Sequence, residues 1–492
     1  MALGLGWKLY GDGSTPPPGE VVRPDERLSW GRTIGLGAQH IVAMFGATFV
    51  FPVVMGLDPN LAIMMSGLAT VVFLLIVQGK IPSYLGTSAA FVGAVATIRA
   101  AGGSSATVTG AILIAGAVLA LAGVLIHLLG AELVNKALPP VVTGAVVLLI
   151  GFNLAPVVAE VYWPQDQWIA LLTMTAVIAM TVLLRGFWSR IAIFLGLVFG
   201  YALSWLFDKG FGQITSVQPG QHDGKAFAHD RVDFSGVTSA DWFGMPSTHA
   251  PDFKTSAILV ALPAVIALIA ENAGHVKAVS EMTGADLDGS LGKAITADGL
   301  GTMMASAVGG SPTTTYAENI GVMAATRVYS TAAYYVAAVV AVLFGLCPKF
   351  GALIAATPGG VLGGITVVLY GMIGLLGAKI WIENKVDFAN PINLVPVAAG
   401  VVIGIGGVAI KFNDDFTIEG IALGTIVTLV IYHALHALAP AHMRDPKAPV
   451  DVELEGGTAL SLGTVEEHRP AAQPLAGSTA AAPPKKAPPT SS

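Results

Sequence analysis

The chain has 492 residues, of which 54% are hydrophobic and only 11% are charged. Because soluble domains carry about 25% charged residues, this composition excludes an ordinary soluble protein and predicts a polytopic membrane protein. The formal net charge of −6 points to no partner, since most acidic residues lie in polar segments, and the single cysteine excludes a disulfide within the chain.

The order of polar and apolar segments predicts fourteen membrane segments. Residues 1–29 are polar, contain no cleavable signal peptide and predict a flexible cytoplasmic arm. The polar stretch 208–253 follows the seventh apolar run, and residues 441–492 should be disordered because Ala, Pro and Lys dominate their end. The apolar runs are approximately 30–53, 60–78, 86–98, 106–128, 139–157, 166–184, 190–207, 255–276, 295–308, 316–326, 330–347, 352–376, 392–410 and 418–439.

The distribution of basic residues fixes the orientation of these segments. An even number of segments places both termini on one side, and the positive-inside rule chooses the cytoplasm. The short outer loops then hold only Arg99, Lys349 and Lys411. The short inner loops hold Arg32, Lys80, Lys136, Arg185, Arg190, Lys277, Lys293, Arg327, Lys379 and Lys385.

Two of the runs, 86–98 and 316–326, are shorter than the roughly 20 residues that a helix needs to cross a bilayer. Residues 88–99 and 316–327 align with four identities, which are two Ala, one Gly and one Arg. The two runs are third and tenth in order, so they cross in opposite directions. Paired short segments of this kind indicate a transporter site built on an inverted repeat.

An extended stretch rich in Thr, Ser and Gly precedes each short run. These stretches are 84–88 and 311–315, and Pro312 disfavours helix at the residue before it. Unwound backbone at membrane depth must be buried in protein or line a cavity. We therefore expect an all-α membrane fold in which two short antiparallel strands meet at mid-membrane before half-helices three and ten. Free N–H groups and the positive ends of these half-helices would face a ligand.

Two carboxylates, Glu271 and Glu318, lie in or beside apolar runs. A charge inside hydrocarbon costs several kcal/mol on most scales, so such residues usually mark a substrate or ion path. Glu271 shares a helix face with His275, four residues on, and the pair could instead cap a helix end at the interface. Glu318 could merely complement the dipole at the start of a helix.

Four further side chains have two interpretations each. Tyr316 could pack on a planar ligand or belong to the interfacial aromatic belt, and Phe91 could contact a ligand or only pack. His40 could act in the site or bond a neighbouring helix, and Asp298 could couple protons or begin a helix. The sequence has no hydrolase or phosphate-loop motif, so we expect neither an enzyme nor a cofactor.

The expected site favours a small lactam. Carboxylates accept hydrogen bonds and backbone N–H groups donate them. A matching ligand carries ring N–H groups beside carbonyl oxygens, as uracil and xanthine do.

Several motifs resemble the nucleobase–ascorbate transporters, also called nucleobase:cation symporters type 2. The resemblance runs from about residue 23 to 440 and, within the family, is greatest to bacterial uracil and pyrimidine permeases. The motifs that carry it are Gln39-His40, Gly79–Ser88, Ala270–His275 and Thr314–Ala324, with Arg23–Leu28, Asp58–Asn60 and Ser88–Gly93 for the pyrimidine branch.

This resemblance implies two inverted repeats of seven segments. It implies a core domain (30–138 and 254–350), a gate domain (139–207 and 351–440) and an extracellular loop (208–253). It also implies a homodimer in the plasma membrane that takes up a nucleobase with protons, and no nucleic acid as partner.

The same resemblance assigns roles to individual residues. Glu271 and Glu318 would bind ring N–H groups. A small residue stands at Ala89 where uracil permeases can carry Phe, so a wider range of bases is possible. The backbone amides of Ala89 and Ala317 would donate to a carbonyl oxygen of the base. Tyr316 would pack on its ring, Ala47 would line the pocket, and His275 and Tyr370 would serve coupling or gating.

The leading hypothesis is therefore a proton-driven importer of uracil or related pyrimidines. A xanthine or uric acid permease is the alternative within the family. A passive anion channel is a different class, which the paired acids disfavour by Coulomb repulsion.

Overall fold

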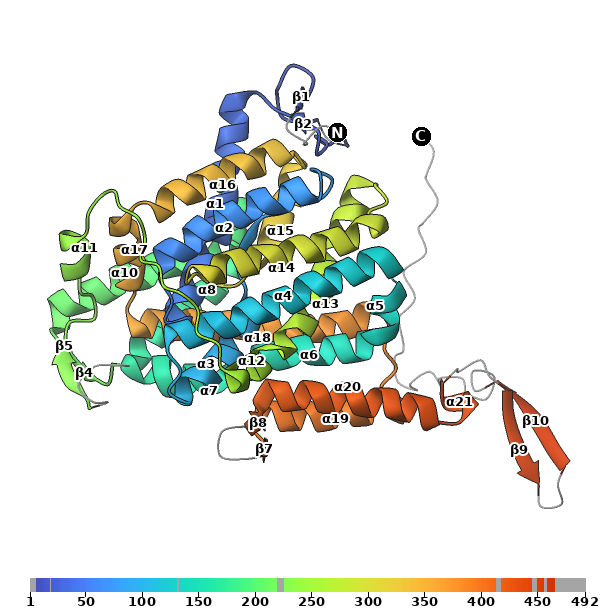
Figure 1. Cartoon of the computed structure of the whole chain (residues 1–492). Coiled ribbons are helices and arrows are strands. Elements are labelled where there is room, and N and C mark those ends of the chain that lie inside the picture. The colour runs from blue at the N-terminus through green and yellow to red at the C-terminus, as the bar shows by residue number, and fades with distance from the viewer. Residues whose placement is uncertain are drawn as a thin grey trace, which may run out of the picture.

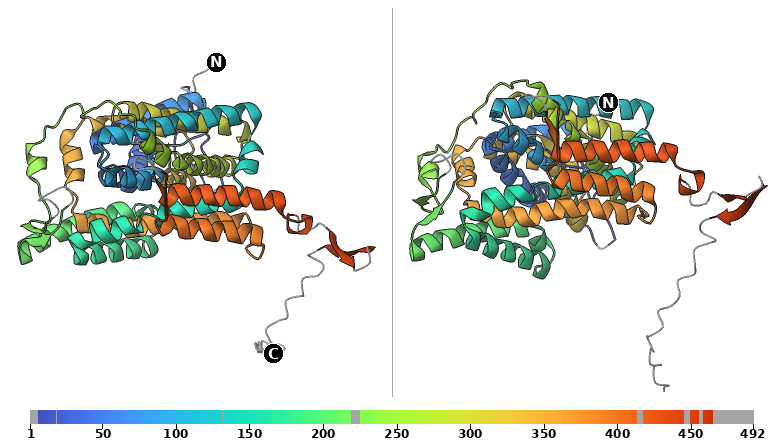
Figure 2. Two further views of the ribbon diagram at one scale, coloured as in Figure 1. Left: turned by 60° about the horizontal axis from the view of Figure 1, so that its bottom comes forward. Right: turned by 90° about the horizontal axis from the view of Figure 1, so that it is seen from below.

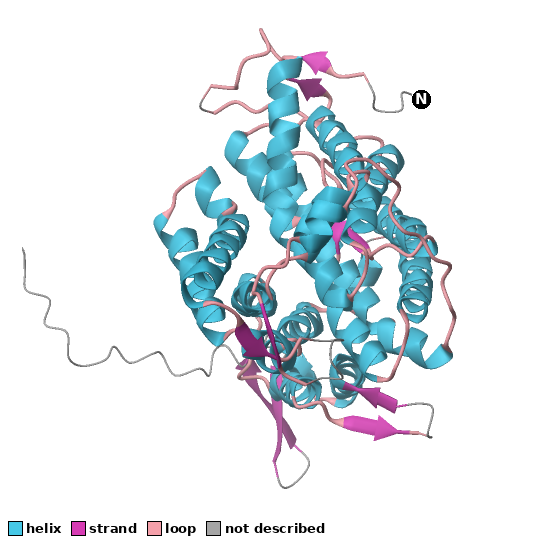
Figure 3. Cartoon of the chain, turned by 90° about the vertical axis from the view of Figure 1, so that its left-hand side faces the viewer, coloured by secondary structure: helices cyan, strands magenta, loops and turns pink. Residues whose placement is uncertain are grey.

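The computed structural model describes residues 6–17, 19–130, 132–218, 225–412, 417–444, 449–454 and 458–464. Within these residues the chain is mostly helical, and strands occur only as short two-stranded pieces (Figure 3). The longer helices are α1 (Trp30–Met55), α2 (Pro59–Ile76), α4 (Ser105–Leu129), α6 (Pro140–Phe152), α8 (Gln167–Leu183), α10 (Ala192–Phe211), α13 (Pro263–Thr283), α14 (Leu291–Ala307), α16 (Thr331–Gly345), α18 (Gly359–Glu383), α19 (Pro391–Ile405) and α20 (Gly420–Leu438).

Short elements connect or precede these helices. The strands are β1 (Lys8–Leu9), β2 (Glu26–Arg27), β3 (Leu85–Thr87), β4 (Ile214–Ser216), β5 (Phe227–His229), β6 (Thr313–Thr315), β7 (Ala409–Lys411), β8 (Thr417–Glu419), β9 (Pro449–Leu454) and β10 (Thr458–Thr464). The short helices are η1 (Ala89–Phe91), α3 (Val92–Ala100), α5 (Glu132–Ala137), α7 (Ala155–Val157), η2 (Val158–Tyr162), η3 (Trp163–Gln165), α9 (Phe187–Arg190), α11 (Ser235–Ser239), α12 (Thr255–Ala261), η5 (Asp288–Ser290), α15 (Ala317–Thr326), α17 (Pro348–Ala355) and α21 (Ala441–Arg444).

The membrane character of the chain is plain in its helices. Eight helical stretches in the described part are long and apolar enough to cross a bilayer, or nine if α16 and α17 form one bent span. Each of the fourteen apolar runs of the sequence overlaps a helix. The count of fourteen membrane segments stays a prediction, because several of these helices are too short to span alone.

The helices pack as two groups. One group contains α1, α2, α4, α13, α14 and α16, and the other contains α6, α8, α10, α18, α19 and α20. In Figure 1, α2, α14 and α4 are stacked above one another, and α19 and α20 lie below them. Figure 2 shows α19 and α20 side by side in both views.

Small residues bring helix backbones together inside each group. A Cβ on Gly123 of α4 would lie 2.3 Å from the backbone nitrogen of Thr296 in α14. A Cβ on Gly151 of α6 would lie 2.1 Å from the nitrogen of Gly374 in α18. Close backbone contact is how membrane helices gain packing energy where lipid is as apolar as the side chains.

Strands β3 and β6 pair antiparallel between the two short helices that follow them. Gly86 pairs with Thr314 at the centre of the register. The alignment of the two short runs places these same two residues opposite each other. A residue paired with its own equivalent is what a twofold axis through the strand pair produces.

The backbone bonds that flank the strand pair have the same symmetry. The amide of Ser88 donates to the carbonyl of Pro312 at 2.9 Å, and the amide of Tyr316 donates to the carbonyl of Tyr84 at 3.1 Å. Ser88 aligns with Tyr316, and Tyr84 aligns with Pro312. Both bonds satisfy backbone groups that would otherwise be buried without partners.

The sequence predicts a flexible N-terminal arm, whereas the described residues of the arm dock on the first group. The indole nitrogen of Trp7 donates to the hydroxyl of Thr331 at 2.8 Å. Val22 exchanges backbone bonds with Arg327 and Tyr329 at 2.9 and 2.8 Å. Buried Val22 also packs with Val328, so a small apolar cluster holds the arm where α15 ends and α16 begins.

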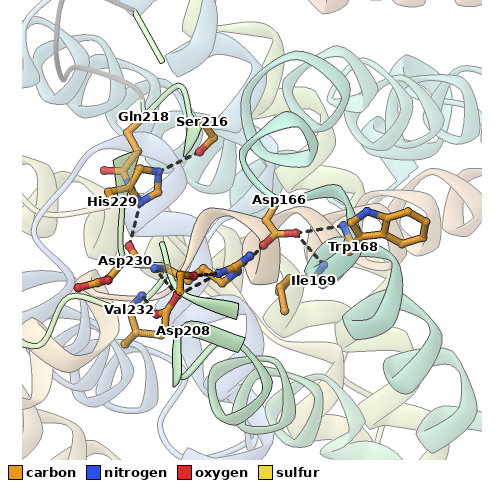
Figure 4. A network of polar contacts seen from close by, with 11 residues as sticks. Asp166, Trp168, Ile169, Asp208, Ser216, Gln218, His229, Asp230 and Val232 are labelled. Carbon is orange, nitrogen blue, oxygen red and sulfur yellow. Dashed lines mark hydrogen bonds and ion pairs between the residues drawn. The ribbon is translucent and has the colours of Figure 1, made fainter. Parts of the chain in front are cut away.

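The polar stretch 208–253 forms a buried ion-pair network on the second group (Figure 4). Arg231 donates to Asp166 at 2.7 Å and to Asp208 at 3.1 Å, and the three side chains are only 7–12% exposed. Asp166 also caps α8 by accepting the amides of Trp168 and Ile169. The hairpin of β4 and β5 is thereby fixed to the start of α8 and the end of α10.

The far end of this stretch is fixed to the first group. The amide of Asp252 donates to the carbonyl of Ala106 at 2.8 Å, and its carboxylate accepts a hydrogen bond from Thr107. The amide of His249 donates to the carbonyl of Val308 at 3.2 Å. We call residues 230–252 the outer strap, because they connect the two groups and belong to the stretch that we expect to be extracellular.

The described part of the C-terminal segment that we expected to be disordered contains two strands. Strands β9 and β10 form an antiparallel hairpin within 441–492. Val450, Val452 and Leu454 alternate with acidic residues, and this period of two favours a strand. The rest of the expected disordered segment beyond α21 lies outside the described residues.

Candidate functional site

The two carboxylates lie on elements that contact each other. Glu318 stands in the first turn of α15, directly after β6, and Glu271 stands on α13, which packs against both α15 and β6. Ala317 and Glu318 are exposed, whereas the residues on either side of them are buried. A Cβ on Gly274 would meet no atom within 4 Å, so α13 also borders open space here.

Glu271 is partly buried and interacts with β6. Its carboxylate accepts a hydrogen bond from the hydroxyl of Thr314 at 3.4 Å. It also lies close enough to Glu318 and Asp298 for their charges to interact. Glu271 does not cap a helix end, because α13 continues for three further turns to Thr283.

A chain of polar contacts connects α13, β6 and α14. The Nδ1 atom of His275 lies 2.7 Å from the hydroxyl of Thr315, which donates to Asn272 at 3.4 Å. The amide of Asn272 donates to Asp298 at 2.6 Å. His275 therefore connects to Asp298 through two intermediate side chains.

Asp298 is fully buried in the middle of α14. The interpretation of this residue as a helix-start acid is wrong for that reason. One of its carboxylate oxygens has no hydrogen-bond partner among the described residues. Such a carboxylate is favourable only when it is protonated or when a further group binds it.

Tyr316 fixes β6 against β3 and α1. Its hydroxyl donates to the carbonyl of Thr87 at 2.6 Å and accepts from Thr48 at 3.2 Å. Its ring covers Gly86, where a Cβ would lie 2.6 Å from the ring. The interpretation as an interfacial belt residue is wrong, because this side chain is buried and its hydroxyl bonds inside the protein.

On the third segment, Ala89 and Phe91 differ in exposure. Ser88 caps the short helix η1 by accepting the amide of Ala90, so Ala89 is its first residue. As first residues, Ala89 and Ala317 have no acceptor for their N–H groups within their own helices. Phe91 is fully buried in the core.

Two polar side chains, one on each helix, hold α15 against α1. The amide of Asn319 lies 3.1 Å from Nδ1 of His40 and donates to the His40 carbonyl at 3.0 Å. The ring of His40 lies 4.3 Å from that of Tyr334. His40 thus contacts a neighbouring helix, as one of its two interpretations held.

Two further predicted residues are Tyr370 and Ala47. Tyr370 of α18 stacks on Phe51 of α1 at 6.5 Å, across the boundary between the two helix groups. Its buried hydroxyl has no partner among the described residues. Ala47 lies in α1, but its side chain is outside the described part of the structure.

Sequence reasoning missed the two asparagines that organise the site. Asn272 and Asn319 are fully buried, and each follows one of the two glutamates. The tripeptide Ala-Glu-Asn occurs at 270–272 and again at 317–319. This repetition is a signal that could have found both residues.

Together these groups can bind a small planar polar molecule. Carboxylates on α13 and α15 accept hydrogen bonds, and the free amides at the starts of η1 and α15 donate them. The positive ends of the two short helices favour electron-rich oxygen atoms of a ligand.

Comparison with known sequences assigns the chain to a family. A profile of the Permease family matches residues 31–411. "Putative pyrimidine permease RutG" of Escherichia coli (strain K12) is 42% identical over 91% of this chain and 98% of its own length. "Uracil permease" of Bacillus caldolyticus is 37% identical over 84% of this chain and 94% of its own length.

Solved structures share the fold at low identity. The murine Solute Carrier 26 member A9 anion transporter in the inward-facing state matches with a TM-score of 0.63 at 10% identity, over 89% of this chain and 73% of that one. The transmembrane domain of the cyanobacterial bicarbonate transporter BicA matches with a TM-score of 0.53 at 14% identity, over 81% and 96%. This similarity concerns the fold alone.

Proposed function

The chain belongs to the Permease family, the family of nucleobase–ascorbate transporters, and from this premise we propose that it imports uracil or related pyrimidines together with protons. It is a transporter rather than an enzyme.

The observation that carries the proposal is the pair of glutamates beside the β3–β6 pair. Glu271 and Glu318 would accept the two ring N–H groups of uracil. The amides of Ala89 and Ala317 would donate to its carbonyl oxygens. Tyr316, fixed by Thr48 and Thr87, would present a rigid ring edge to the base.

The transport cycle would be alternating access by two inverted repeats of seven segments. The symmetric register of β3 and β6 supports the repeat, and the packing of helices as two groups supports a core that moves against a gate. In this arrangement the base would lie at the end of each strand, at mid-membrane, between the two groups.

Coupling would use the acids of the site. Three carboxylates near one another cannot all stay ionised away from water without a large electrostatic cost. A proton would lower the negative charge of the site by one, and a neutral base would add no charge to it. The contacts from His275 to Asp298 offer a route along which the proton could redistribute.

The protein would work in the plasma membrane with both termini in the cytoplasm. The excess of Lys and Arg in the short loops on that side supports this orientation. Membership of the family supports assembly as a homodimer.

The test is uptake of radiolabelled uracil by cells that lack their own nucleobase permeases. We expect concentrative uptake that a proton uncoupler abolishes and that sodium does not affect. Competition by xanthine or uric acid stronger than by thymine would favour the purine alternative. Uptake that survives the uncoupler would contradict proton coupling while leaving the substrate in place.

A further inference from the structure

The outer strap carries three large apolar side chains that point away from the protein. Trp242, Phe243 and Met245 are 76%, 76% and 74% exposed, and we call them the strap patch. Single exposed apolar residues are common on proteins. A contiguous group of them marks an interaction surface.

The strap patch is held in one place by α17. The amide of Lys349 donates to the carbonyl of Asp241, and the amide of Gly244 donates to the carbonyl of Leu346, both at 3.0 Å. The ammonium of Lys349 also lies 5.0 Å from the centre of the Trp242 ring. These contacts on both sides of the patch fix its position relative to α16 and α17.

Helix α17 lies across the end of α16 rather than along it. The two helices meet at an angle of 82°, and Figure 1 shows α17 nearly perpendicular to α16. Gly351 and Ile354 of α17 are buried, whereas Leu353 is exposed. Helix α17 thus packs one side on protein and leaves an apolar side chain open on another, as a helix in the plane of a membrane interface can do.

The open side of α17 continues an exposed apolar surface of α16. Val339 and Leu343 of α16 are 58% and 59% exposed, and no described element covers them. They lead along the helix to α17 and so to the strap patch. The opposite end of α16 binds the N-terminal arm at Thr331, so the patch is at the other membrane boundary.

We propose that the strap patch inserts into the lipid interface at the end of α16 and anchors the outer strap to the bilayer. Trp242 would lie at headgroup depth, where indole rings are favoured, with Phe243 and Met245 among the upper acyl chains. Lys349 would contact lipid phosphate while its charge stays over the indole ring.

A fluorescent probe in the reconstituted full-length protein tests this proposal. Cys347 is the only cysteine, so Cys347→Ser gives a background without thiols. Phe243→Cys is then labelled with the environment-sensitive dye NBD in vesicles of phosphatidylcholine and phosphatidylglycerol. Thr248→Cys, an exposed residue of the same strap, is the matched control.

We expect blue-shifted emission at residue 243 and quenching by lipids with a shallow nitroxide at least about twofold stronger than at residue 248. Equal quenching at the two positions would overturn the proposal. Blue-shifted emission that nitroxide lipids do not quench would also overturn it, because another protein surface would then cover the patch.

Discussion

At the scale of single residues, the site depends on which atoms can accept a proton or a hydrogen bond. Glu271 is the clearest case, because its carboxylate is an acceptor on both oxygens and only Thr314 binds it in the described contacts. Its other lone pairs have no partner among the described contacts. A ligand N–H group would satisfy them.

Replacing Glu271 with Gln should weaken uracil binding. The amide offers one acceptor in place of two, and the loss of a charged hydrogen bond costs about 1.5–3 kcal/mol, roughly ten- to a hundredfold in Kd. Binding to the purified protein measures the effect. Glu281→Gln, at an exposed position on the same helix, is the control and should leave Kd unchanged. Unchanged binding in Glu271→Gln would remove this residue from the site.

Replacing Ala89 with Phe should narrow the range of bases. Ala89 is half-buried at the start of η1, so a larger side chain there would occupy space beside the free amides. We expect inhibition of uracil uptake by thymine and xanthine to fall while uracil itself is retained. The same change at Ala100, the exposed last residue of α3, is the control. An inhibition profile that does not change would show that residue 89 does not line the pocket.

At the scale of elements, threonines on two helices hold the strands. Thr70 of α2 accepts the amide of Leu85 at 2.9 Å, and Thr302 of α14 accepts the amide of Thr313 at 3.1 Å. Each threonine lies on the helix that precedes its strand. The strands are too short to be stable alone, so these side chains supply part of what a wider sheet would supply.

Thr302→Val should therefore destabilise the protein more than an ordinary Thr→Val change. It leaves the buried amide of Thr313 without its partner, which costs about 1–3 kcal/mol. A thermal unfolding assay in detergent should show a lower midpoint, together with weaker uracil binding. Thr175→Val, where an exposed threonine bonds only its own helix, is the control. Equal midpoints for the two variants would contradict this role.

Sequence reasoning located the helices but not all their contacts. Apolar runs predict helices because backbone groups in lipid must form their hydrogen bonds within the segment. The Thr-rich stretches indicated where the helices end. The docked arm and the Arg231 network were missed, since they join residues far apart in the chain. Trp7 and Thr331, or Arg231 and Asp166, have no local pattern that pairs them. The roles of Asn272 and Asn319 also came only from the packing.

At the scale of the whole molecule, transport should follow the proton gradient. If a proton neutralises the acids during import, uptake should rise as external pH falls and should collapse with an uncoupler. His275→Ala should flatten this pH profile more than it weakens binding, because Thr315 loses its contact with the imidazole. His433→Ala, at an exposed position on α20, is the control. Uptake that follows a sodium gradient instead would rule this mechanism out.

Arg231→Ala should destabilise the side of the molecule that carries the outer strap. Removing one partner leaves Asp166 and Asp208 buried without their counter-charge, and breaking such a pair costs about 3–5 kcal/mol. Limited proteolysis should then cut the outer strap faster than in the unchanged protein. Arg185→Ala, in a short loop outside this network, is the control. Equal cleavage rates would show that the network does not secure the strap.

The outer strap also limits how far the two helix groups can part. Phe234 stacks on Tyr201 of the second group, whereas Asp241 already bonds α17, which packs with the first. The few residues between them reach on the order of 25 Å when fully extended, and less while α11 stays helical. The strap is thus a short covalent connection between the two groups on one face of the protein. If one group rotates against the other, the axis of rotation would lie near the strap. The displacement between the groups would then be larger at the opposite face.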